Sequence, residues 1–140
     1  YAFGNGVINA PYAMSKAGVE SFGRALRAEL AGTGATATVL YPGWIQTPMT
    51  RVAFGANPHA SELIEKVFPA PFRQLITPEV VALAVTQGLA KRAPRIIVPK
   101  RWAPFAALRG LLNMYTDRMF DRRSDLQAII RRTENDTQDR

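Results

Sequence analysis

Two short, β-branched apolar stretches, each preceded by a helical pattern, restrict the fold of this chain more than any other feature. They read TATVLYPG (residues 36–43) and RIIVP (95–99). Both predict buried strands, because turn residues bound them and their apolar runs are short. One helical pattern spans 13–31, and another begins at the N-cap residue Thr77 with Pro78 in its first position. This alternation of helix and strand predicts an α/β fold with parallel strands.

Two parallel strands alone are marginally stable in water and need cover on both faces. We therefore expect residues 1–101 to be the C-terminal half of a larger, doubly wound parallel-sheet domain. The first residue is not methionine and residues 1–11 have a loop composition, so we expect the chain to begin in mid-protein. Residues 48–75 are long, irregular and rich in proline, which predicts a lid with one short helix over 61–68.

Charge is distributed unevenly along the 140 residues. The net charge is +7, of which residues 1–90 contribute +1 and residues 91–140 contribute +6. Residues 102–140 read as a basic, amphipathic helical tail with a disordered polar end. The simpler interpretation is that this tail packs on the lid or on a neighbouring subunit. The alternative is that residues 102–132 make peripheral membrane contact. No recognisable nucleic-acid module interleaves arginines with exposed aromatics, so we expect no nucleic-acid partner.

The cysteine and histidine content of the chain excludes several kinds of site. The chain has no cysteine and a single histidine, His59. Disulfides, thiolate metal sites and multi-histidine metal sites are therefore excluded, and we expect no metal. The lack of cysteine fits a reducing compartment, and no stretch is long and apolar enough to span a membrane. We expect a cytoplasmic protein.

Tyr12 and Lys16 lie one helical turn apart near the start of the first helical pattern. A phenol is a poor acid or base at neutral pH, but residues four apart on a helix are neighbours. A cation about 5–6 Å from the phenol oxygen stabilises the phenolate by roughly 3 kcal/mol at an effective dielectric near 20. The helix N-terminus adds a smaller effect of the same sign. The pair therefore indicates general acid–base chemistry, although one lysine near one aromatic residue is also a common chance pattern.

The rest of the first helical pattern supplies an apolar stripe. It consists of Val19, Phe22, Leu26 and Leu30, which recur at steps of three and four, while Glu20 lies off the stripe. The second helix has an apolar face made of Val81, Val85 and Leu89, with Ala82 beside them.

In this order and spacing, the motifs resemble the short-chain dehydrogenase/reductase family. The resemblance covers residues 1 to about 100. Its motifs are YAMSKAG (Tyr12–Gly18), PGWIQT (Pro42–Thr47), TPEVVA at the start of the next helix, and the RIIVP strand. It implies a Rossmann-type oxidoreductase domain that uses NAD or NADP.

The resemblance also implies residue roles. Tyr12 would be the acid/base that exchanges a proton with the substrate oxygen, and Lys16 would activate it and bind the nicotinamide ribose. The remaining cofactor-binding residues would be Pro42, Gly43, Ile45 and Thr47, with Ile45 acting through its backbone. As alternatives, Pro42–Gly43 can be an ordinary turn and Thr47 an N-cap.

The family's substrate-polarising serine and glycine-rich phosphate loop would lie before residue 1. We therefore expect this chain alone to be inactive. The whole protein is expected to interconvert a carbonyl and a secondary alcohol. The apolar lid suggests a small lipophilic substrate, although its side chains can equally close a core. A homo-oligomer through the 13–31 helix is implied, and the rival interpretation is a non-catalytic oligomerisation or membrane-surface module.

Overall fold

A computed structural model describes residues 9–50 and 58–138 of the chain. Its elements are α1 (Ala10–Glu29), β1 (Val39–Pro42), α3 (Pro58–Val67), α4 (Ala70–Arg73), α5 (Pro78–Ala90), β2 (Arg95–Val98), a 3₁₀ turn (Lys100–Trp102), α6 (Ala103–Arg122) and α7 (Ser124–Gln138). The predicted loop over 1–8, residues 51–57 of the predicted lid and residues 139–140 lie outside the described residues.

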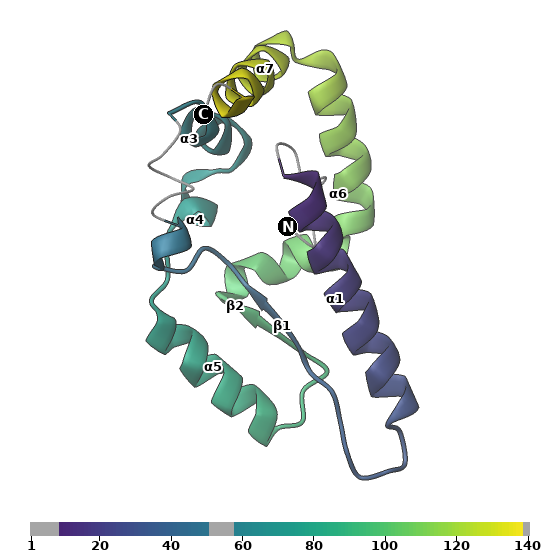
Figure 1. The fold of residues 1–140 in the computed structure, drawn as a ribbon. Helices are drawn as coiled ribbons and strands as arrows, with labels where there is room; N and C mark the ends of the chain where they lie inside the picture. Colours follow the sequence, from purple (N-terminus) through teal and green to yellow (C-terminus); the bar gives the residue numbers. More distant parts are fainter. Residues whose placement is uncertain (1–8, 51–57, 139–140) are drawn as a thin grey trace.

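The two strands pair in parallel, which confirms the predicted α/β class and strand direction (Figure 1). Their register runs from Val39 opposite Arg95 to Pro42 opposite Val98. Because neighbouring residues of paired strands point to the same face, Val39 and Ile96 face opposite sides of the sheet. Val39 meets α1 and Ile96 meets α5, so the two helices cover opposite faces.

Each covering helix approaches the sheet at a glycine. A Cβ added at Gly23 of α1 would lie 2.6 Å from Val39 Cγ2, and one added at Gly88 of α5 would lie 2.3 Å from Ile96 Cδ1. A side chain at either position would force the Val39 or Ile96 side chain, or the helix itself, to move. The layers are therefore held at the separation that two glycines allow.

The inward face of α1 differs from the one that the apolar stripe suggested. Ala13 and Glu20 are buried, whereas Val19 is 61% exposed and Phe22 is 68% exposed. The expectation that Glu20 lies off the packed face is wrong. The helix also begins earlier than predicted, at Ala10, because Pro11 fits its first turn.

Helix α5 begins as predicted, with Thr77 at the N-cap and Pro78 in the first turn. Val81 is buried against the sheet, but Leu89 is 55% exposed and Ala82 is also exposed. The predicted apolar face is therefore correct in its first turn and wrong at its C-terminal end, where Gly88 makes the contact instead.

The tail forms two helices, not one. The chain leaves helical geometry at Arg123, where φ is −98° and ψ is 98°. Gln127 Nε2 donates hydrogen bonds to the carbonyls of Phe120 and Asp121, which satisfies the end of α6. Helix α7 continues to Gln138, and the expected disorder of the chain end stays a prediction. Thr133 is buried and donates its hydroxyl to the carbonyl of Ile129.

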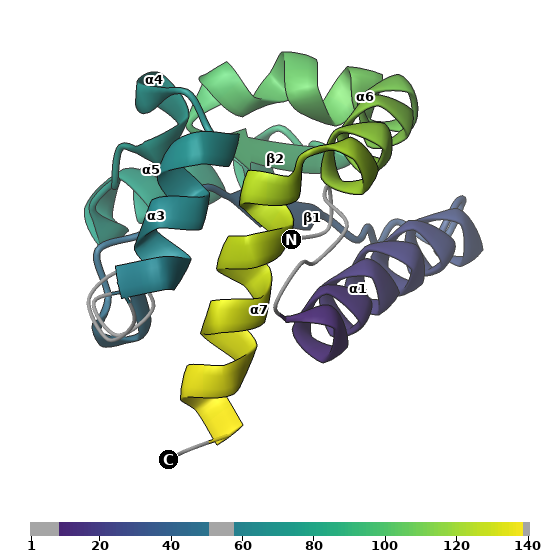
Figure 2. The same cartoon turned by 90° about the horizontal axis from the view of Figure 1, so that it is seen from above.

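The tail packs on the lid segment, in agreement with the simpler of its two interpretations. Leu126 and Ile129 of α7 pack on Leu63 of α3 and form a buried apolar cluster. Figure 2 shows α7 lying beside α3. A second, aromatic cluster joins the lid to the start of the tail through Trp44, Phe68, Phe72, Trp102 and Phe105. Several of the lid's apolar side chains thus close a core.

Membrane contact by the tail stays a prediction. None of the helices within the described ranges combines the length and hydropathy that a membrane crossing requires.

Candidate functional site

Tyr12 and Lys16 lie in contact on the first two turns of α1. The Lys16 ammonium Nζ is 4.9 Å from the centroid of the Tyr12 ring. The cation therefore lies over the face of the phenol, where the ring quadrupole attracts it. Tyr12 is half-buried and Lys16 is exposed, so both can be reached from solvent. The structure thus brings together the two residues that the sequence pairs.

The other predicted site residues follow β1 in one short segment. Pro42 ends the strand, and the Gly43 N–H donates to the carbonyl of Val98 at 2.7 Å. Ile45 then forms an isolated parallel bridge with Ile76. That bridge uses the Trp44 carbonyl and the Gln46 N–H, at 2.8 and 2.9 Å, and does not use the N–H of Ile45.

Thr47 caps the short helical turn that follows it. Its hydroxyl accepts from the Thr50 N–H at 3.3 Å, while the Thr50 hydroxyl accepts from the Thr47 N–H at 3.0 Å. This reciprocal arrangement is an N-terminal cap. The structure therefore supports the capping interpretation of Thr47, and its cofactor contact stays a prediction.

Gly43 has a structural reason to lack a side chain. A Cβ there would lie 2.8 Å from Trp102 Nε1 and 3.0 Å from Pro99 Cδ. The indole of Trp102 therefore occupies the space beside the turn, so the first residue of the predicted tail packs directly on a predicted cofactor-binding residue.

The Tyr12–Lys16 pair and the turn after β1 lie at the same end of the molecule. The chain descends along α1, turns, and returns along β1, so the start of α1 and the end of β1 lie at the same end (Figure 1). In open α/β sheets, ligands bind beyond the carboxyl ends of the strands. An acid–base group placed at this end can meet a ligand that lies along the turn.

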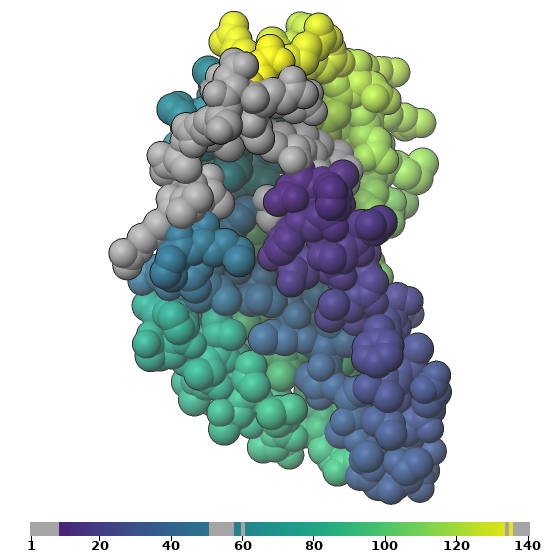
Figure 3. All heavy atoms as spheres, viewed as in Figure 1, coloured from purple at the N-terminus to yellow at the C-terminus, as the bar shows by residue number. Residues whose placement is uncertain are grey.

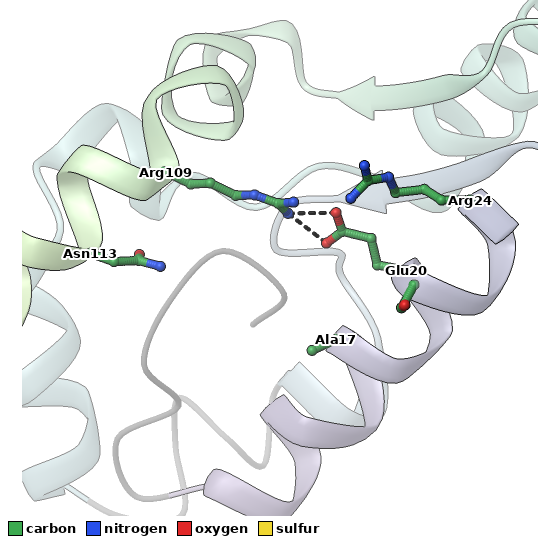
Figure 4. Close-up of a pocket in the computed structure, with 6 residues that line it drawn as sticks. Ala17, Glu20, Arg24, Arg109 and Asn113 are labelled. Carbon is green, nitrogen blue, oxygen red and sulfur yellow. Dashed lines mark hydrogen bonds and ion pairs between the residues drawn. The ribbon is translucent and has the colours of Figure 1, made fainter.

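A second cluster of polar residues, which the sequence did not reveal, lies two turns further along α1. Glu20 is 7% exposed, and its carboxylate oxygens both lie 2.6 Å from Arg109 Nη1 of α6. Arg24 points towards the same carboxylate (Figure 4). No local pattern marks this pair, since its partners are 89 residues apart.

Tyr41 of β1 belongs to this cluster. Burial and the neighbouring Glu20 carboxylate, which accepts a hydrogen bond from the phenol, raise the pKa of Tyr41 above its ordinary value. The Tyr41 hydroxyl therefore belongs to the polar cluster around Glu20.

A small pocket of about 260 Å³ opens beside the Glu20–Arg109 pair. It is lined by Ala17, Glu20, Ser21, Arg24, Arg109 and Asn113. Helix α1 lies at the surface on the face shown in Figure 3, so the pocket lies between a surface helix and α6. Within residues 9–50 and 58–138, acidic and histidine side chains form no group that could hold a metal ion.

Comparison with protein families gives one match over most of the chain. A family model described as enoyl-(acyl carrier protein) reductase, of the short-chain dehydrogenase/reductase type, matches residues 4–97. The matched range contains both Tyr12 and the turn after β1, and it ends within β2, before α6 and α7 begin.

Curated relatives resemble the same part of the chain. A protein of Streptomyces virginiae, named as a candidate ketoacyl reductase of the monensin polyketide synthase, is 44% identical over 82 residues, or 54% of this chain and 31% of its own length. A candidate ketoacyl reductase of Streptomyces coelicolor is 44% identical over 61 residues, which are 43% of this chain and 22% of the relative.

An uncharacterised oxidoreductase of Mycobacterium tuberculosis is 54% identical over 43 residues, which are 31% of this chain and 17% of the relative. The chain therefore spans less than a third of the length of each of these relatives. No solved structure gives a significant match.

Proposed function

The chain belongs to the short-chain dehydrogenase/reductase family, and from this premise we propose that the full-length protein is an NAD(P)-dependent oxidoreductase that interconverts a carbonyl and a secondary alcohol. The observation that supports this most directly is the contact between Tyr12 and Lys16 at the end of the molecule where β1 ends. The proposal concerns the whole protein, because this chain covers only part of its relatives' length.

In the proposed reaction, Tyr12 handles the proton. When the carbonyl is reduced, its oxygen gains negative charge and takes the proton from the Tyr12 hydroxyl; oxidation of the alcohol reverses this transfer. The bound nicotinamide supplies or accepts the hydride at the substrate carbon. After Tyr12 has given up its proton, Lys16 stabilises the resulting phenolate, since the Lys16 ammonium lies over the ring.

The donors near the end of β1 fit a nicotinamide nucleotide. The Ile45 N–H lies off the bridge to Ile76 and suits a carboxamide oxygen, while the Thr47 hydroxyl suits a phosphate or ribose oxygen. The Lys16 ammonium, which is exposed, suits the ribose hydroxyls. Pro42 and Gly43 would shape the backbone next to the cofactor.

The proposed substrate is a ketone on an acyl chain. Two relatives are named as candidate ketoacyl reductases, and that chemistry is a carbonyl-to-alcohol reduction on a lipophilic chain. The lid's aromatic residues give less support than the sequence suggested, because Phe68 and Phe72 already pack on Trp102. The family's serine and glycine-rich loop are not among these residues, so the chain alone should not turn over.

Replacing Lys16 with alanine in the full-length protein should lower kcat about 10- to 1,000-fold with a ketoacyl thioester and NADPH or NADH, because the phenolate loses its stabilising cation. Nicotinamide absorbance reports the rate. Lys91→Ala, at the C-terminal end of α5, is the matched control and should stay within about twofold of wild type. A wild-type protein that oxidises neither nicotinamide with any of a panel of carbonyls, or a Lys16→Ala protein with normal kcat, would contradict the proposal.

We also propose that α1 contributes to a homo-oligomer. Its outer half exposes Met14 (74%), Val19 (61%) and Phe22 (68%), apolar side chains that a second copy would cover. The non-catalytic alternative would use this same face, so oligomer formation alone does not separate the two functions.

Phe22→Glu should reduce the mass of the full-length protein, measured by light scattering during size-exclusion chromatography, because a charge would be placed in the buried contact. Leu83→Glu alters an apolar side chain of α5 that is 60% exposed, and it should leave the mass unchanged. A monomeric wild type, or an unchanged Phe22→Glu oligomer, would remove α1 from the contact.

A further inference from the structure

The tail reaches back to the helix that holds the catalytic pair. Helix α6 lies outside the range that the family model matches, which ends at residue 97. Yet Arg109 of α6 contacts both carboxylate oxygens of Glu20 at 2.6 Å (Figure 4). Glu20 lies one turn beyond Lys16 and two turns beyond Tyr12, on the same side of α1.

The link depends on ionic and hydrogen-bonding groups more than on apolar packing. The pocket of about 260 Å³ lies between α1 and α6 beside the pair, so the Arg109 side chain spans a gap. The Glu20 carboxylate is almost fully buried, and the Tyr41 hydroxyl also donates to it. A buried carboxylate that loses its cation is strongly unfavourable, so α1 should move to rehydrate Glu20 when Arg109 is removed.

The opposite half of α1 is held by a different set of contacts. Arg27 donates to the Thr36 hydroxyl and the Ala37 carbonyl, both at 2.7 Å, and to the Arg92 carbonyl at 3.0 Å. Gly23 rests on Val39. The Glu20–Arg109 link lies on the other side of Gly23 from Arg27, towards Tyr12, and therefore restrains the half of the helix that bears the catalytic pair.

We propose that Arg109, acting through Glu20, is a positioning residue: the segment that follows the family fold fixes the direction of α1, and so the placement of Tyr12 and Lys16 relative to the substrate. This inference rests on the proposed function for its kinetic consequence. Its structural consequence, a tether between α6 and the N-terminal half of α1, is independent of catalysis.

The test compares Arg109→Ala with Arg118→Ala, an exposed arginine on the same helix, in the full-length protein. Hydrogen–deuterium exchange should increase at least tenfold over residues 13–20 in Arg109→Ala and remain unchanged in Arg118→Ala. In the same proteins, kcat should fall at least tenfold for Arg109→Ala while the KM for the nicotinamide stays within about twofold. Arg109→Lys keeps the charge and should restore part of kcat.

A double variant distinguishes a positioning role of Arg109 from a general loss of structure. Glu20→Gln keeps the size of the side chain but removes the ionic link. Combining it with Arg109→Ala should cost no more than the larger single effect, because both changes break one interaction. Should Arg109→Ala fail to fold, Glu20→Gln and Arg109→Lys supply the same comparison.

The outcomes distinguish the two proposals. Suppose that Arg109→Ala increases exchange over residues 13–20 and that the wild-type protein shows no nicotinamide turnover. This result would support the tether and contradict the proposed function. Turnover that is unchanged in Arg109→Ala, with unchanged exchange, would contradict the tether and leave the proposed function in place. Fully additive losses in the double variant would also overturn the inference.

Discussion

Replacing Tyr12 with phenylalanine in the full-length protein is expected to lower kcat by about 100- to 10,000-fold, the usual range for loss of a general acid–base group. The ring, and with it the stacking partner of Lys16 at 4.9 Å, is retained. Only the hydroxyl that is proposed to exchange the proton is lost. Nicotinamide oxidation with a ketoacyl thioester measures kcat, and the KM for the nicotinamide should change little because Lys16 remains.

Tyr115→Phe is the matched control for this change. Tyr115 lies on α6 and is 68% exposed, so the loss of its hydroxyl should leave kcat within about twofold of wild type. Far-ultraviolet circular dichroism, which reports the backbone, should be the same for both variants. A Tyr12→Phe protein that turns over normally would exclude Tyr12 from the chemistry, whatever the family assignment.

Replacing Leu126 with alanine should destabilise the protein by about 2–5 kcal/mol, the cost of deleting a fully buried leucine side chain. Leu126 of α7 has no exposed surface and packs with Leu63 of α3 and Ile129. The cavity would open between the tail and the lid. Urea denaturation of the full-length protein, followed by circular dichroism, measures the free energy of unfolding.

Leu111→Ala provides the comparison for that loss. Leu111 is a leucine of α6 that is 70% exposed, so its truncation should change the free energy of unfolding by no more than about 0.5 kcal/mol. Equal effects of the two substitutions would mean that α7 does not pack on α3 in the protein.

Local signals explain which parts of the fold could be predicted. Thr77 and Pro78 mark the start of α5, and the β-branched run before Pro42–Gly43 marks β1, because cap and turn chemistry depends on near neighbours. The contact between Tyr12 and Lys16 follows from helical geometry in the same way. Cofactor contacts by the residues after β1 remain predictions.

Features that depend on distant residues could not be read from the sequence. Periodicity placed Glu20 off the packed face of α1, but Arg109, 89 residues away, neutralises it and permits its burial.

The break between α6 and α7 at Arg123 did have a local signal, since Ser124 and Asp125 are typical of a helix start. The burial of Thr133 of α7 is a further feature that its polar sequence context did not indicate.

The contact between Gly23 and Val39 is the point at which α1 rests on the sheet, so a tilt of this helix would turn about it. Tyr12 lies eleven residues from Gly23, or about 16 Å along the axis at a rise of 1.5 Å per residue. A tilt of only a few degrees about this contact would displace the Tyr12 phenol by about an ångström. A misplacement of that size can cost about a hundredfold in rate. The absence of a side chain at residue 23 would thus influence the proposed proton transfer at Tyr12, three turns away.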